Sequence, residues 1–143
     1  MPQLLFLCTG NYYRSRFAEE LFNHLARDQD LNWRADSCGL DLARGIFNIG
    51  PISPATAMAL TKMGVALPDP LRFPRDVCEN DLLASSRVIA LKESEHRPMM
   101  TTRFPVWSDR VEYWHIHDLD LATAPEALAE IERLVRRLIE ELS

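Results

Sequence analysis

The sequence predicts an α/β fold, in which helices cover both faces of a parallel β-sheet. Short apolar runs alternate with segments whose apolar residues recur every three or four positions, as strands and helices alternate in such folds. The length of 143 residues suits one domain, expected to span residues 1–143. A composition that is 47% hydrophobic and 26% charged is typical of a globular protein and argues against a disordered chain or a coiled-coil rod.

The first two strands and the helix between them follow from the pattern near the N-terminus. Residues 2–8 form an apolar run of the kind that a parallel sheet buries on both faces. After a polar loop, a helix is expected from Ser15, because apolar residues three and four positions apart then share one face. Residues 32–37 are expected to form the second strand.

Glycine and proline mark the middle of the chain. Residues 39–53 contain several glycines and predict a loop. Ser53 is a good N-cap and Pro54 a good first residue for a second helix, which Gly64 is expected to end. Three prolines within residues 66–76 predict irregular structure there.

The second half of the chain continues the alternation. A helix, a strand, a helix and a strand are expected, in that order, at residues 81–84, 87–91, 93–100 and 111–116. The final helix has the clearest pattern, because apolar residues from Leu128 to Leu142 recur with 3-4-3-4 spacing. Ligands bind at the C-terminal ends of parallel strands, so we expect the site among the loops at residues 8–15, 37–50 and 117–123.

Charge, hydropathy and cysteine usage argue against several classes of protein. A net charge of −5 disfavours a nucleic-acid binder, and no apolar run approaches the length of a membrane span. The N-terminus lacks the basic start of a secretory signal. The three cysteines have neither disulfide-framework nor zinc-site spacing, so a cytoplasmic location is expected. Cys38 and Cys78 are expected to be buried.

The loop between the first strand and the first helix carries the clearest chemistry. Gly10 and Asn11 tolerate backbone angles that turn successive N–H groups inward, where they can hold an anion above a helix N-terminus. Such surroundings favour the ionised form of a thiol, so Cys8 is expected to be a nucleophilic thiolate. Arg14 is expected to grip two oxygens of a tetrahedral anion such as phosphate or sulfate.

Residues 4–15 and 17–22 resemble the signature of the low-molecular-weight protein tyrosine phosphatases. The resemblance continues through nearly the whole chain, at residues 32–37, 48–51, 74–75, 87–91 and 114–118. It implies a single-domain, three-layer α/β sandwich with a four-stranded parallel sheet. It also implies hydrolysis of phosphomonoesters through a phosphocysteine intermediate, without a metal or an organic cofactor.

The resemblance assigns a role to each part of the loop. Cys8 attacks phosphorus, and Arg14 holds the phosphoryl oxygens. Ser15 hydrogen-bonds the thiolate and assists its departure, while Asn11 and Ser37 brace the loop. The expected phosphate-binding residues are Thr9, Gly10, Asn11, Tyr12, Tyr13, Arg14 and Ser15.

The leaving group needs a proton, and no acidic residue precedes Cys8. In the family an Asp-Pro pair after the fourth strand supplies the general acid, and Asp118 matches that Asp. Leu119 stands in place of the Pro, and Asp120 is the alternative acid.

The histidines are expected to bind no metal. His115 and His117 are two positions apart, but no third ligand is visible in the sequence. His24 and His96 fall on predicted helices and are expected at the surface.

The expected partner is a protein phosphorylated on tyrosine, or a small aryl phosphate, because Tyr12 and Phe47 are expected to form an aromatic rim for a phenyl ring. A phosphoarginine phosphatase and an arsenate-reductase-like enzyme are alternatives. Residues 92–96 contain no resolving cysteine, which argues against arsenate reduction. A catalytically weak phospho-ligand binding module is the alternative from another class, suggested by Leu119 and by Arg16, where many relatives have Pro.

Overall fold

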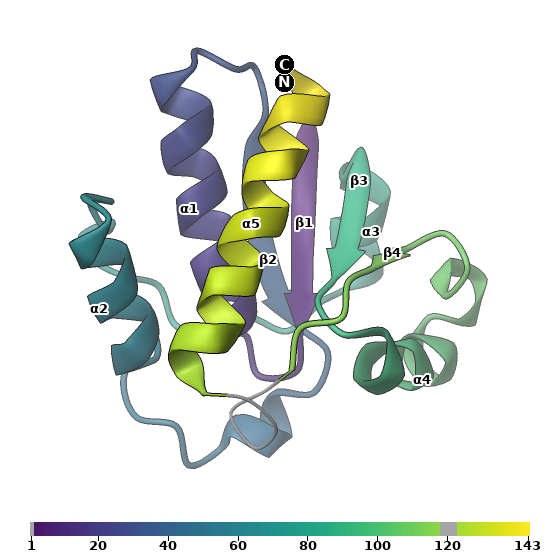
Figure 1. The fold of residues 1–143 in the computed structure, drawn as a ribbon. Helices are drawn as coiled ribbons and strands as arrows, with labels where there is room; N and C mark the ends of the chain where they lie inside the picture. The colour runs from purple at the N-terminus through teal and green to yellow at the C-terminus, as the bar shows by residue number, and fades with distance from the viewer. Residues whose placement is uncertain (1, 118–122) are drawn as a thin grey trace.

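The computed structural model describes residues 2–117 and 123–143. Its centre is a four-stranded sheet in the order β2-β1-β3-β4, with every neighbouring pair of strands parallel (Figure 1). The strands are β1 (Gln3–Cys8), β2 (Arg34–Gly39), β3 (Arg87–Ala90) and β4 (Glu112–Tyr113). The predicted α/β class and the parallel sheet are therefore confirmed.

Helices lie on both faces of this sheet. The α-helices are α1 (Arg14–Asp28), α2 (Pro54–Lys62), α3 (Glu79–Ala84), α4 (Glu93–Arg103) and α5 (Ala124–Leu142). Two short 3-10 helices, η1 (Leu42–Gly45) and η2 (Pro105–Trp107), lie in the connections. No helix in the described ranges is long and apolar enough to cross a membrane.

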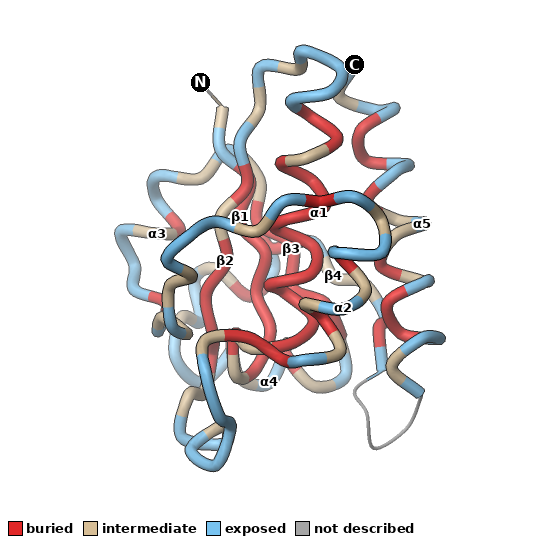
Figure 2. The backbone as a smooth tube through the Cα atoms, turned by 90° about the vertical axis from the view of Figure 1, so that its left-hand side faces the viewer, coloured by how far each residue is buried: buried red, intermediate tan, exposed pale blue. Residues whose placement is uncertain are grey.

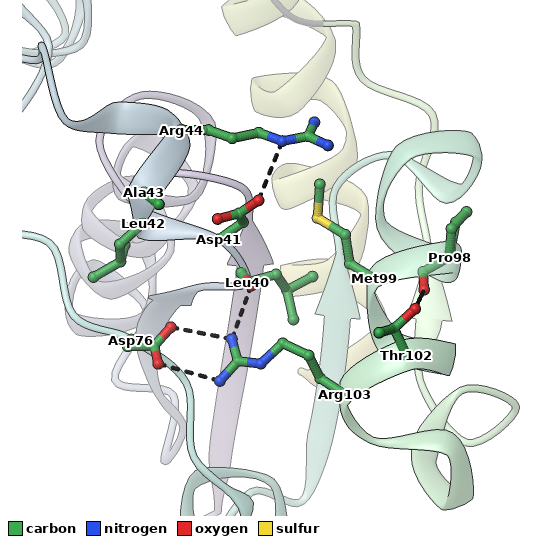
Figure 3. Close-up of a pocket in the computed structure, with 10 residues that line it drawn as sticks. All are labelled: Leu40, Asp41, Leu42, Ala43, Arg44, Asp76, Pro98, Met99, Thr102 and Arg103. Atoms are coloured by element: carbon green, nitrogen blue, oxygen red, sulfur yellow. Dashed lines mark hydrogen bonds and ion pairs between the residues drawn. The ribbon is translucent and has the colours of Figure 1, made fainter.

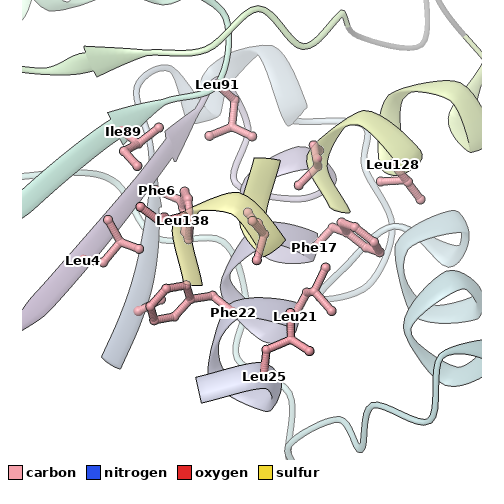
Figure 4. Close-up of a cluster of buried hydrophobic side chains, with 14 of the residues drawn as sticks. Leu4, Phe6, Phe17, Leu21, Phe22, Leu25, Ile89, Leu91, Leu128 and Leu138 are labelled. Carbon is pink, nitrogen blue, oxygen red and sulfur yellow. The ribbon is translucent and has the colours of Figure 1, made fainter. Parts of the chain in front are cut away.

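Alternate residues of β1 belong to different hydrophobic clusters, as the twofold repeat of a strand requires. Leu4 and Phe6 pack with α1 and α5 in the larger cluster (Figure 4). Leu5 and Leu7 belong to a second cluster with residues of α3 and α4. Both faces of the central strand are therefore buried, and Figure 2 shows the sheet as the buried centre of the molecule.

The final helix matches its prediction closely. The residues with 3-4-3-4 spacing in α5 are buried against α1 and the sheet as far as Leu138. Thr123 and Glu126 form a capping box at its start, in which each side chain accepts a hydrogen bond from the other residue's backbone N–H.

Several element boundaries differ from the predictions. The second strand begins at Arg34 and continues to Gly39, and α4 continues to Arg103 instead of ending at Met100. The fourth strand is Glu112–Tyr113 rather than residues 111–116. It is short because the carbonyl of Trp114 accepts a hydrogen bond of 2.9 Å from the N–H of Glu93, the first residue of α4.

Two expectations about burial are wrong. His96 lies on a helix but is fully buried, because it faces the loop that follows β1. Cys78 is exposed, because it is the N-cap of α3 at the surface, whereas Cys38 is buried as expected.

The strands place the expected site at one end of the molecule. The C-terminal ends of β1 and β2 point to the end where η1 lies (Figure 1). The start of β1 and the end of α5 lie together at the opposite end. The C-terminal end of the strands, where η1 lies, is the edge at which parallel α/β sheets bind ligands.

Candidate active site

Cys8 is the last residue of β1, and the chain then turns through residues 9–13 into α1. The left-handed backbone in this turn belongs to Asn11, with φ of 50°, one of the two residues that the sequence offered for such an angle. Asn tolerates this region because its short polar side chain hydrogen-bonds locally. The thiol therefore lies at the C-terminal end of the sheet and beside the N-terminus of α1.

A chain of hydrogen bonds connects Cys8 to the polar residues beneath the loop. The Cys8 Sγ lies 2.9 Å from the Ser15 Oγ. The Asn11 Nδ2 donates to the Ser15 Oγ at 2.8 Å and to the Ser37 Oγ at 2.9 Å. The Ser37 hydroxyl in turn donates to the Glu19 Oε1 at 2.6 Å. Because Ser15 accepts from Asn11, its own hydrogen is available to a thiolate on Cys8.

One arginine in this network was not predicted from the sequence. Arg72 donates to the Asn11 Oδ1 at 2.9 Å, to Glu19 at 3.0 Å and to Ser37. It comes from the proline-rich segment that was expected only to be irregular. The contact joins residues 61 positions apart, which no local pattern in the sequence predicts.

Arg16, which stands where many relatives have Pro, is also buried behind the loop. Its guanidinium donates to the carbonyls of Pro51 and Arg72 at 2.9 and 2.8 Å. Burial lowers the pKa of Arg16, and the neighbouring charge of Arg72 acts in the same direction. Arg16 therefore ties two loops to the start of α1 rather than disturbing the catalytic loop.

Arg14 is buried at the first position of α1. It donates to the carbonyl of Ile116 at 3.0 Å and to the Glu95 Oε2 at 2.8 Å. Thr9 and His96 contact the same carboxylate. Glu95 and His96 were not among the predicted site residues, because α4 has no sequence feature that places it against the loop.

These groups surround a cavity of about 310 Å³. Its lining residues are Cys8, Thr9, Gly10, Tyr12, Tyr13, Arg14, Arg44, Gly45, Asn48, Ser53 and Glu95. The Tyr12 hydroxyl donates to the carbonyl of Ile49 at 2.6 Å, which fixes its ring at the edge of the cavity. Phe47, the other expected rim residue, is 92% exposed and does not line the cavity.

Asp118 and Asp120, the two expected acids, lie outside the described residues. The chain leading to them reaches the site, because the carbonyl of Ile116 accepts from Arg14. His115 and His117 are exposed, and within residues 2–117 and 123–143 no three His, Cys, Asp or Glu side chains form a metal-binding group.

A larger cavity of about 770 Å³ lies next to the first, and Arg44 lines both (Figure 3). Its walls come from residues 40–44 and from α4. Arg103 there is paired with Asp76, and Arg44 with Asp41. Cys8 and Arg14 line the smaller cavity and not this one, so the smaller one is the candidate active site.

The sequence is similar to those of known phosphatases. Residues 3–143 match the family described as low molecular weight phosphotyrosine protein phosphatase. The protein-arginine-phosphatase of Bacillus subtilis (strain 168) is 27% identical over 108 residues, which cover 76% of this chain and 67% of that protein.

The fold is similar to solved structures. The low molecular weight protein tyrosine phosphatase from T. tengcongensis has a TM-score of 0.81 at 24% identity, covering 99% of this chain and 100% of that one. Vibrio vulnificus Wzb, solved in complex with benzylphosphonate, has a TM-score of 0.81 at 14% identity and covers 99% of both chains. Because the family match extends over almost the entire sequence and the fold agrees with it, this chain is a cysteine-based phosphatase of the low molecular weight phosphotyrosine protein phosphatase family.

Proposed function

We propose that the protein hydrolyses phosphotyrosine in phosphorylated proteins, with Cys8 as the nucleophile and Arg14 as the phosphoryl-binding residue. The observation that carries this proposal is the chain of hydrogen bonds from Glu19 through Ser37, Asn11 and Ser15 to Cys8, at the floor of the cavity that Arg14 lines. We also propose a cytoplasmic location, because a reactive thiolate stays reduced only in a reducing compartment.

The first half-reaction transfers the phosphoryl group to the enzyme. The Cys8 thiolate attacks phosphorus, and the bond between phosphorus and the tyrosine oxygen breaks. The departing phenolate takes a proton from Asp118. The backbone N–H groups of the loop and the guanidinium of Arg14 hold the phosphoryl oxygens, where the negative charge lies.

The second half-reaction restores the enzyme. Water attacks the phosphocysteine while the Asp118 carboxylate takes the water's proton, and the phosphorus–sulfur bond breaks to release inorganic phosphate. The Ser15 hydroxyl donates to the departing thiolate of Cys8, which lowers the free energy of that step.

A phosphoarginine phosphatase is the second candidate. It is favoured by the similarity to the protein-arginine-phosphatase of Bacillus subtilis and by the carboxylate of Glu95, a counter-charge for a guanidinium, in the lining of the cavity. Tyrosine is preferred because the ring of Tyr12, held by its bond to Ile49, presents an aromatic wall.

Paired phosphopeptides test the choice of substrate. Two peptides of the same sequence, one with phosphotyrosine and one with phosphoarginine, are compared by the kcat/KM for phosphate release. We expect the phosphotyrosine peptide to be the better substrate by at least about tenfold, a difference of roughly 1.4 kcal/mol in transition-state binding. The reverse preference would assign the second function. Cys8→Ser should abolish turnover of both peptides while still binding vanadate, and turnover near wild type would exclude the phosphocysteine mechanism.

A second pair of variants tests the acid. Asp118→Ala should lower kcat by about 10²–10⁴-fold for phenyl phosphate, because phenolate is a poor leaving group without a proton. The loss should be smaller for p-nitrophenyl phosphate, whose leaving group is stable as an anion. If Asp118→Ala has no effect on phenyl phosphate and Asp120→Ala does, the acid is Asp120.

A further inference from the structure

We propose that Glu95 is the positioning residue for Arg14, and that Thr9 and His96 hold its carboxylate in place. This inference rests on the proposed function, because it assigns the group that prepares the phosphoryl-binding arginine. It goes beyond that function by giving α4, on the opposite face of the sheet from α1, a part in orienting the phosphoryl-binding arginine.

Three donors converge on one oxygen of Glu95. Its Oε2 accepts from Arg14 at 2.8 Å, lies 3.1 Å from the His96 Nε2, and also accepts from the Thr9 hydroxyl. The side chain of Glu95 is 20% exposed, and that of Arg14 is 2% exposed. Because Arg14 is almost completely buried and Glu95 largely so, this bond holds its geometry more firmly than a surface pair does.

The tautomer of His96 is fixed by its other ring nitrogen. The backbone N–H of Lys92 donates to the His96 Nδ1 at 3.0 Å, so that nitrogen carries no proton. The proton of the neutral ring is therefore on Nε2, which faces the Glu95 Oε2 and the Thr9 Oγ1. His96 acts as a buried donor, which explains why it is not at the surface.

These contacts keep Glu95 ionised. Burial alone would raise the pKa of its carboxyl, but hydrogen bonds from His96 and Thr9, with the charge of Arg14, hold that pKa well below its usual range. The carboxylate therefore remains charged near neutral pH, as a partner for the Arg14 guanidinium must.

Two separate parts of the chain hold the Arg14 guanidinium. Its NH1 donates to Ile116, after β4, and its NH2 donates to Glu95 on α4. A planar group held at two points has its orientation fixed before the substrate arrives. The negative charge of Glu95 beside the cavity also opposes the binding of a phosphate anion. Glu95 should therefore stabilise the bound transition state more than it stabilises the bound substrate.

The test compares Glu95→Gln and Glu95→Ala with the matched control Glu93→Gln. Glu93 lies in the same turn of α4, but its carboxylate pairs with Arg97 at 2.8 Å, away from the cavity. For p-nitrophenyl phosphate, both Glu95 variants should lose about 10- to 100-fold in kcat with a KM that is unchanged or lower. The control should stay within about twofold of wild type.

Inhibition constants separate positioning from a merely structural role. Vanadate resembles the transition state, so its affinity should fall by about tenfold or more in Glu95→Ala, whereas inorganic phosphate should bind as well as before or more tightly. Equal losses for both anions would indicate general damage to the cavity. A rise in kcat would show instead that Glu95 blocks the site, and either result overturns the proposal.

A double-mutant cycle tests whether Glu95 acts through Arg14. In an Arg14→Lys background, Glu95→Ala should have little further effect on kcat, because the group that it orients is gone. Additive losses would contradict the proposal. If wild type and Cys8→Ser turned over equally, the proposed function itself would fail. If only the Glu95 variants matched wild type, the function would stand and this inference alone would fail.

Discussion

At the scale of single residues, Asn11 connects the loop after β1 to two other parts of the chain. Its amide nitrogen donates to Ser15 and Ser37, and its Oδ1 accepts from Arg72 and from the backbone N–H of Arg75. The sequence, through its family resemblance, predicted that Asn11 and Ser37 would brace the loop, a role that stays a prediction. It did not predict the partners of the oxygen, because they come from a segment without periodicity.

The burial of Glu20 makes the stability of the fold depend on pH. Glu20 is 7% exposed in α1, and burial, together with the charge of Glu19 and a hydrogen bond that the protonated Glu20 donates to Glu19, raises its pKa to about 7. A carboxyl whose pKa is higher in the folded protein stabilises the fold fully below its unfolded pKa of about 4.3. That contribution is lost as the pH rises through 7.

Replacing this carboxyl by an amide should make stability less dependent on pH. Because Gln does not ionise, Glu20→Gln should gain Tm relative to wild type between about pH 4.5 and pH 7, and the gain should level off above that range. Thermal unfolding of both proteins at pH 5 and pH 8 measures the effect. A difference in Tm that is equal at the two pH values would show that Glu20 is charged in the folded protein throughout.

At the scale of secondary-structure elements, the order of strands and helices was predictable and the contacts between distant elements were not. Periodicity placed α5 and β1 because burial on one face or on both leaves a repeat in the sequence. The fourth strand was predicted too long because the carbonyl of Trp114 pairs with the N–H of Glu93 in α4, a tertiary contact that competes with the sheet. Glu95 was missed for the same reason, since its bond to Arg14 joins residues 81 positions apart.

The end of β2 packs closely against the loop of residues 9–13, and this packing leads to a prediction for Gly39. Gly39 pairs with Cys8 in the sheet, and a Cβ at this position would lie 2.8 Å from the carbonyl oxygen of Thr9. That oxygen belongs to the backbone of the loop, so it can move only if the whole turn of residues 9–13 moves. Gly39→Ala should therefore lower Tm by several degrees, on the order of 1–3 kcal/mol, and should lower kcat as well.

Gly10→Ala is the matched control for stability. A Cβ there would find its nearest neighbour, the Asn48 amide, at an ordinary contact distance of 3.6 Å. Its Tm should stay within about a degree or two of wild type, because a substitution without a clash changes stability little. Equal losses of Tm in the two variants would show that the loop tolerates no side chain at all, and the close approach at Gly39 would then explain nothing specific.

At the scale of the whole molecule, the sheet separates the two buried cysteines. Cys8 is on the same face of β1 as Leu4 and Phe6, and its sulfur contacts Ser15 of α1. Cys38 packs with Leu5 and Leu7 on the other face. In the register of the two strands Cys8 lies beside Gly39, and Cys38 lies beside Leu7. The two side chains therefore point away from each other across the sheet.

This separation decides what oxidation does to the enzyme. Peroxide that enters the cavity should convert Cys8 to a sulfenic acid, which forms a disulfide only if a second thiol is in reach. Burial raises the pKa of Cys38 to about 12, so it stays a protonated and unreactive thiol. The position before Arg14 is Tyr13, so residues 9–13 contain no second thiol, and Cys78 is exposed at the start of α3.

We therefore expect sustained peroxide to convert Cys8 to sulfinic and sulfonic acids, with a loss of activity that dithiothreitol does not reverse. Mass spectrometry should find the added oxygen on the Cys8 peptide, and inorganic phosphate should slow its formation by filling the cavity. Cys38→Ala should be inactivated at the wild-type rate and recover as little, because Cys38 faces away. A peptide that links Cys8 to Cys38, with full recovery on reduction, would mean that the end of β1 opens far enough to bring the two faces of the sheet together.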